Sequence, residues 1–160
     1  MGRLVPWSGG VVASVGFVKR RPLLALGVAV AWTVFVWATR IRNALGDDSL
    51  EGGALAGVLL LSASFLAGSL VVVLAAVDAV RQRRLGERWP TTTLSVSVVV
   101  MAAWNAVVWA SRMVGIATNG SHDFAFVAVH VVIGLSSIAL WLVTVFSIFE
   151  GRSEEKSLIG

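Results

Sequence analysis

Two tryptophan–arginine pairs are the residues of this sequence whose types and spacing could do chemistry. Trp37 precedes Arg40 by three positions, and Trp109 precedes Arg112 by the same three. On a helix, residues three apart lie on one face, so each guanidinium can lie beside an indole ring. A guanidinium supplies several fixed N–H donors, which suit a carboxylate or a phosphate. The pattern predicts a symmetric cationic site for an anion, a lipid headgroup or a partner's carboxylate.

The same four residues have a second interpretation that needs no ligand. Tryptophan gathers at membrane interfaces, and arginine near the end of a spanning helix extends to the headgroup level. Under this interpretation Trp37, Arg40, Trp109 and Arg112 only mark the membrane boundary. We expect membrane anchoring as their first role and ligand binding as the alternative.

Other polar residues within apolar runs are expected to join helices. Asn105, Ser64 and Ser136 each stand in such a run. In lipid, side chains of this kind form hydrogen bonds between helices, and small residues let helices approach closely. The four-residue spacings Gly53–Gly57 and Ser64–Gly68 therefore predict close helix packing, within the protein or between copies of it.

His130 is the one histidine within an apolar run. Haem held between helices usually takes histidines from facing helices, and the other three runs contain none. We expect His130 to be hydrogen-bonded to a neighbour and the protein to hold no cofactor. One haem shared by two copies of His130 in a dimer is the weaker alternative. The chain has no cysteine, which excludes disulfides and thiolate-held metals.

The elements that position these residues are four long apolar runs. The chain is 57% hydrophobic and 14% charged, with a mean hydropathy of +0.85, whereas soluble domains carry about 25% charged residues. The runs cover residues 22–39, 54–77, 91–111 and 124–149. Each is long enough to cross a bilayer, and helices satisfy their own backbone in lipid. We predict an all-α integral membrane protein of four transmembrane helices. The long, bulky start favours an uncleaved first helix over a signal peptide.

An internal repeat relates the two halves of the chain. The segment Trp32–Arg40 matches Trp104–Arg112 at an offset of 72 positions. Ser64 with Ser136, and Asp78 with Glu150, keep that offset. The unit is a two-helix hairpin, and two tandem copies lie parallel, related by a pseudo-twofold axis along the membrane normal. The predicted organisation is a head at 1–21, a first transmembrane hairpin at 22–81, a connection at 82–93, a second transmembrane hairpin at 94–150 and a tail at 151–160.

Orientation follows from the distribution of arginine and lysine. Ten of these residues lie in the head, the 82–93 connection and the tail, or just before them, and three lie on the opposite side. Basic residues favour the cytoplasmic side. We expect a multi-pass protein of the plasma membrane with both termini in the cytoplasm. Since topology accounts for the basic residues, we expect no nucleic-acid partner.

These features favour a non-enzymatic structural or accessory subunit of a membrane complex. No catalytic set and no metal-ligand spacing stand out in the sequence. The expected partners are the lipid bilayer and other membrane proteins or a second copy of the chain. The alternative is a small oligomeric transporter or channel that uses Arg40, Arg112 and Asn105. A haem-binding electron-transfer subunit that uses His130 is the weaker alternative.

Overall fold

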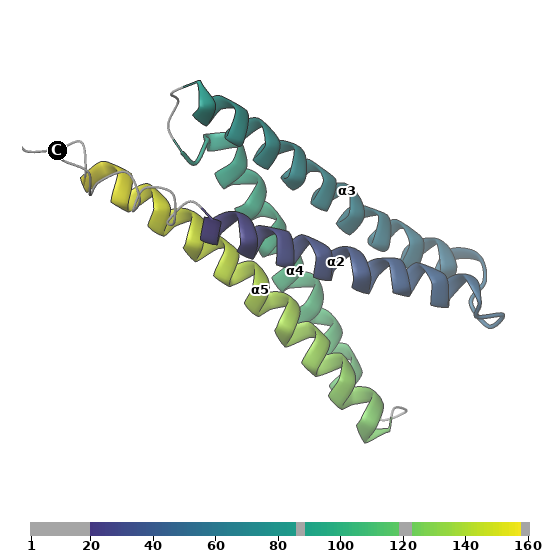
Figure 1. Cartoon of the computed structure of the whole chain (residues 1–160). Coiled ribbons are helices and arrows are strands. Elements are labelled where there is room, and N and C mark those ends of the chain that lie inside the picture. The colour runs from purple at the N-terminus through teal and green to yellow at the C-terminus, as the bar shows by residue number, and fades with distance from the viewer. Residues whose placement is uncertain (1–19, 86–88, 119–122, 158–160) are drawn as a thin grey trace, which may run out of the picture.

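The computed structural model describes residues 20–85, 89–118 and 123–157, and these form four helices (Figure 1). The helices are α2 (Arg20–Leu45), α3 (Gly52–Arg84), α4 (Thr92–Thr118) and α5 (Phe124–Ser157). Each is long and apolar enough to cross a membrane. The prediction of an all-α membrane protein with four spanning helices is confirmed. The predicted head at 1–21 lies almost entirely outside the described residues.

The helices continue past the apolar runs into charged sequence. Helix α2 passes Arg40 and ends at Leu45, and α4 passes Arg112 and ends at Thr118. Arginine has a high helix propensity, so a charged residue at the edge of an apolar run need not end a helix. As a result, Arg40 and Arg112 each lie more than one turn inside their helices.

Local chemistry fixes where three of the helices begin. At the first residue of α3, Gly52 has a φ of +54°, a backbone conformation that favours glycine. At the start of α4, the hydroxyl oxygen of Thr91 accepts a hydrogen bond from the backbone N–H of Leu94 (3.3 Å). At the start of α5, a carboxylate oxygen of Asp123 accepts from the backbone N–H of Phe126 (2.7 Å). Threonine and aspartate are favoured in this capping role because they satisfy donors that the helix leaves open.

The four helices form two antiparallel hairpins that cross. Helix α2 packs against α3 and α5, and α4 packs against the same two helices. The α2–α3 and α4–α5 connections lie on the same side of the molecule, at the right and lower right of Figure 1. We call this side the distal end. The proximal end holds the start of α2 and the α3–α4 connection.

Two indole hydrogen bonds tie the hairpins together reciprocally. The Nε1–H of Trp32 in α2 donates to the hydroxyl of Ser137 in α5 (2.9 Å). The Nε1–H of Trp104 in α4 donates to the hydroxyl of Ser64 in α3 (3.2 Å). In each case the first helix of one hairpin bonds the second helix of the other, as a twofold relation between the hairpins would produce. Ser64 thus accepts a bond from a neighbouring helix, whereas on α5 the acceptor is Ser137 and not its neighbour Ser136.

A third indole bond has no equivalent in the other half of the bundle. The Nε1–H of Trp141 donates to the hydroxyl of Thr33 (3.0 Å), and both residues are buried. At the offset of 72, their counterparts are Ser69 and Asn105. These are also buried, but the hydroxyl of Ser69 and both polar atoms of the Asn105 amide have no hydrogen-bond partner. Asn105 thus lies in the interior of the bundle without a described bond to another helix.

The two small-residue spacings differ in what they face. A Cβ added at Gly68 would lie 2.8 Å from the sulfur of Met101, so α4 approaches α3 closely there. At Gly53 and Gly57, nothing lies within 4 Å of an added Cβ. The Ser64–Gly68 spacing therefore belongs to a helix contact within the bundle, and the Gly53–Gly57 spacing faces outward.

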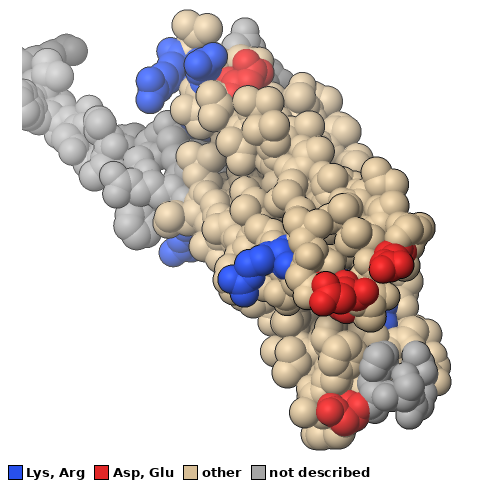
Figure 2. All heavy atoms as spheres, turned by 90° about the vertical axis from the view of Figure 1, so that its right-hand side faces the viewer, with Lys and Arg blue, Asp and Glu red and all other residues tan. Residues whose placement is uncertain are grey.

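The outward faces of the helices are apolar. In each helix, only 28% to 39% of the residues in an apolar stretch of 18 residues are buried inside the bundle. In Figure 2, charged side chains form separated groups around a broad uncharged surface. Lipid is the solvent that suits such a surface.

The unpaired amide of Asn105 gives a prediction about stability. Asn105→Thr should raise the free energy of unfolding in detergent by about 1 kcal/mol, because a threonine hydroxyl can donate to its own helix, as Thr33 does to the carbonyl of Ala29 (2.8 Å). Thr33→Val, the matched control, removes the acceptor of the Trp141 bond and should lower that free energy by about 1 kcal/mol. Thermal unfolding of both variants measures the effect. Equal destabilisation by the two changes would contradict an unpaired Asn105.

Candidate anion-binding site

Both predicted tryptophan–arginine pairs line one pocket at the distal end. Its volume is about 170 Å³, and it lies between α2, α4 and α5. The pocket thus brings together residues that are distant in the sequence and belong to both hairpins. Its lining residues are Phe35, Val36, Trp37, Thr39, Arg40 and Asn43 of α2, Trp109 and Arg112 of α4, and His130 and Ile133 of α5.

Packed aromatic rings form the inner wall of the pocket. Trp37 is buried and stacks on Phe65 of α3, with ring centroids 4.1 Å apart. The rings of Trp37 and Trp109 lie 6.2 Å apart, across the bundle. Stacked and tilted aromatic pairs add stability beyond that of simple burial. These rings hold the pocket's indoles in fixed positions.

Arg112 lies over an indole of the other hairpin. Its guanidinium carbon is 5.7 Å from the ring centroid of Trp37. A cation at this distance is attracted by the face of the ring. The sequence spacing predicts a neighbour on the same helix, Trp109, and does not predict this contact between hairpins.

Two positive charges share the pocket, and none of its described lining residues is a carboxylate. Arg40 and Arg112 are close enough for their charges to repel each other. Asp47, an exposed residue of the α2–α3 connection that does not line the pocket, attracts Arg40 electrostatically. Hydrogen bonds from the side chain and backbone of Ser49 hold the pKa of the Asp47 carboxyl below its ordinary value, so it is ionised at neutral pH.

The pocket also holds hydrogen-bond donors that have no acceptor. The Nε atom of Arg40 and the Nε1 atom of Trp109 are buried, and neither has a partner. Leaving such groups unpaired away from water is costly. A group that offers only acceptors, such as a phosphate or a carboxylate, would offset the repulsion between the arginines.

His130 contributes a ring at the edge of the same pocket. Its Nδ1–H donates to the backbone carbonyl of Phe126 (2.8 Å), and the two rings lie 4.1 Å apart. The expectation of a histidine hydrogen-bonded to a neighbour is confirmed. Sequence reasoning treated His130 separately from the arginines, whereas the fold places it beside them. Among the described residues, no group of three or more histidines and carboxylates could hold a metal ion.

Thr39 and Asn43 line the pocket and were missed from the sequence. Together with Val36 and Arg40 they follow the spacing of one helix face. This spacing could have identified Thr39 and Asn43 from the sequence, provided that the helix was taken to continue past Arg40.

Comparisons of this chain with protein-family models, with curated proteins and with solved structures find no match. The function of the pocket is therefore inferred from its own residues.

Proposed function

We propose that this chain is a non-enzymatic accessory subunit of a membrane complex that holds an oxyanion, a phosphate or a carboxylate, in its distal pocket. One observation carries the proposal: Arg40, Arg112 and Trp109 line one pocket, and the described residues of its wall include no carboxylate. Guanidinium groups stay protonated in proteins, so Arg40 and Arg112 suit binding and not proton transfer.

The size and position of the pocket suit a single charged group. Its volume of about 170 Å³ equals roughly six water molecules at about 30 Å³ each. Arg40 and Arg112 come from different hairpins, so one oxyanion between them would join the hairpins at the distal end. A ligand that binds only the folded state stabilises it.

The ligand can come from the bilayer or from a neighbouring protein. Phe35 at the pocket is 63% exposed, so the rim of the pocket includes a surface suited to lipid or to another membrane helix. The phosphate of a lipid and the carboxylate of a partner's side chain can both accept paired hydrogen bonds from the planar guanidinium group of an arginine. In both cases the chain acts by holding a neighbour in place.

A second candidate function is transport, favoured by the position of Asn105. Asn105, Trp109 and Arg112 follow one face of α4, and Asn105 has unpaired polar atoms in the bundle interior. Polar groups thus continue from the pocket toward the middle of the membrane. A path for an anion would need such groups.

Arginine-to-lysine changes test the proposed site. Arg40→Lys and Arg112→Lys should each weaken binding of inorganic phosphate roughly tenfold, because lysine loses the planar donor pair of arginine. If both arginines hold one ligand, the single variants should resemble each other and the double variant should be non-additive. Arg42→Lys is the matched control, because Arg42 is exposed on the same helix and does not line the pocket. Titration of the purified chain, followed by tryptophan fluorescence, gives the affinities.

Further arms of this experiment separate the sources of the ligand. Phosphatidylglycerol retained in mild detergent would identify lipid, and a protein that co-purifies with the wild type but not with Arg40→Lys would identify a partner. Phosphate flux into vesicles that contain the chain alone would favour the transporter. If Arg40→Lys and Arg112→Lys match Arg42→Lys in every arm, the residues are membrane anchors and the proposed site is wrong.

In the proposed orientation, the protein lies in the plasma membrane and its proximal end faces the cytoplasm. Arg81, Arg83 and Arg84 lie at the proximal end of α3, in support of this orientation. A reporter fused after Gly160 should be active in the cytoplasm, and one inserted within residues 118–123 should be active outside. An external signal from the Gly160 fusion would contradict the orientation.

A further inference from the structure

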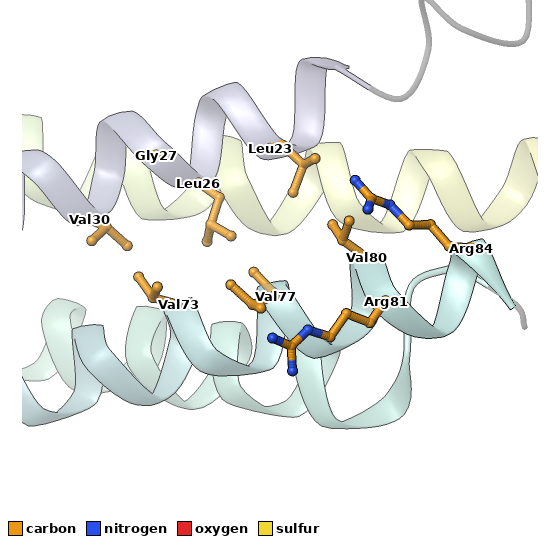
Figure 3. A pocket seen from close by; sticks show the side chains of 10 residues that line it. Leu23, Leu26, Gly27, Val30, Val73, Val77, Val80, Arg81 and Arg84 are labelled. Carbon is orange, nitrogen blue, oxygen red and sulfur yellow. The ribbon is translucent and has the colours of Figure 1, made fainter.

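A groove runs between α2 and α3 at the proximal end, remote from the distal pocket (Figure 3). Its volume is about 400 Å³, and aliphatic side chains such as Leu26 and Val30 of α2 and Val73 and Val77 of α3 form its walls. Arg81 and Arg84 line it at the end nearest the α3–α4 connection. The groove therefore combines an apolar trough with a cationic end.

A second hollow continues the groove at this end. It has a volume of about 370 Å³, shares Leu23, Val80 and Arg84 with the groove, and adds Arg83 and Trp89. Three arginines thus lie around the proximal end of the groove, and none of the described residues that line either hollow is a carboxylate. The carboxylate of Asp78, nearby on α3, is exposed and accepts a hydrogen bond from Gln82 (2.6 Å).

The arginine side chains extend back along the groove. In Figure 3 both side chains run back toward the middle of α3 and not beyond its end. The guanidinium group of Arg84 lies between α2 and α3 beside Val80, and that of Arg81 lies next to Val77 on the side away from α2. Arginine commonly covers apolar surface with its stem while its head stays at the polar boundary. A molecule lying in the trough would therefore meet these cations at its polar end.

The floor of the groove is open because α2 has a glycine there. Nothing lies within 4 Å of a Cβ added at Gly27, which lines the groove. A larger side chain at this position would enter the trough without displacing the protein. This gives a way to fill the groove while leaving every charge in place.

We propose that this groove binds one anionic phospholipid. The headgroup phosphate lies at Arg81 and Arg84, and one acyl chain lies in the trough between α2 and α3. Basic pockets between spanning helices at the cytoplasmic side are typical sites for anionic headgroups. The volume suits a small molecule, for which pockets of about 300–1,000 Å³ are usual, and not a further helix, whose diameter is about 10 Å. This site uses a different end of the bundle and different arginines from the distal pocket, so either can fail without the other.

The test measures lipid retained by the full chain in native mass spectrometry, after extraction from vesicles of phosphatidylcholine and phosphatidylglycerol. The wild type should retain phosphatidylglycerol in preference to phosphatidylcholine. Arg81→Gln or Arg84→Gln should weaken that retention roughly fivefold, and the double variant roughly thirtyfold. Gly27→Leu should reduce retention of both lipids, because it fills the trough. The controls are Arg42→Gln and Gly57→Leu; the latter adds the same side chain at an open position outside the groove.

Three results would overturn the proposal. One is equal retention of the two lipids by the wild type, and another is unchanged retention in the Arg81→Gln, Arg84→Gln double variant. The third comes from a photo-crosslinking residue at Gly27, which should label a phospholipid. Labelling of residues 1–19 or of another protein would show that something else occupies the groove. If Gly27→Leu fails to fold, the arginine variants and the crosslink still decide the question.

Discussion

Hydrocarbon offers no hydrogen-bond partner, so each polar side chain within this bundle must find one in the protein or in a bound group. Three indole N–H groups each donate a hydrogen bond to a hydroxyl of the other hairpin. The pairs are Trp32 with Ser137, Trp104 with Ser64, and Trp141 with Thr33. Arg40 and Trp109 each have a buried N–H donor without a hydrogen-bond partner, and both residues line the distal pocket. Buried unpaired groups also occur outside the pocket, at Ser69 and Asn105. The physical basis for placing a ligand in the pocket is therefore the pair of guanidinium groups that line it, with no carboxylate among its described lining residues.

The proposed duplication accounts for why the two arginines share one pocket. Residues related by a twofold axis come close to each other only near that axis. The rings of Trp37 and Trp109, equivalent in the repeat, lie 6.2 Å apart. Arg40 and Arg112 lie one turn further along the same helices, so they lie on opposite sides of the twofold axis. A ligand on that axis could contact both arginines. Where the halves have diverged, as at Thr33 and Asn105, one hydrogen bond has no equivalent.

The sequence was sufficient for the number of helices and for the grouping of Trp37, Arg40, Trp109 and Arg112, because long apolar runs and a repeat are properties of the chain itself. The sequence could not predict those contacts between helices that depend on how one helix is rotated against another. Ser136 and Ser137 are adjacent and chemically alike, and only the rotation of α5 decides which one meets Trp32. For the same reason the spacing of two glycines could not distinguish Gly68, under Met101, from Gly57 on the outer face. The groove beside Gly27 is likewise a product of packing between α2 and α3.

The central claim is that an oxyanion lies between the guanidinium groups of Arg40 and Arg112. An experimental structure of the protein extracted together with its native lipids and partners tests it most directly, at a resolution that shows side chains and headgroups. The account predicts density for a phosphate or a carboxylate about 2.8 Å from nitrogen atoms of both arginines. It also predicts that the indole N–H of Trp109 faces this density. Guanidinium groups turned outward to separate positions at the headgroup level, with nothing held between them, would contradict the account.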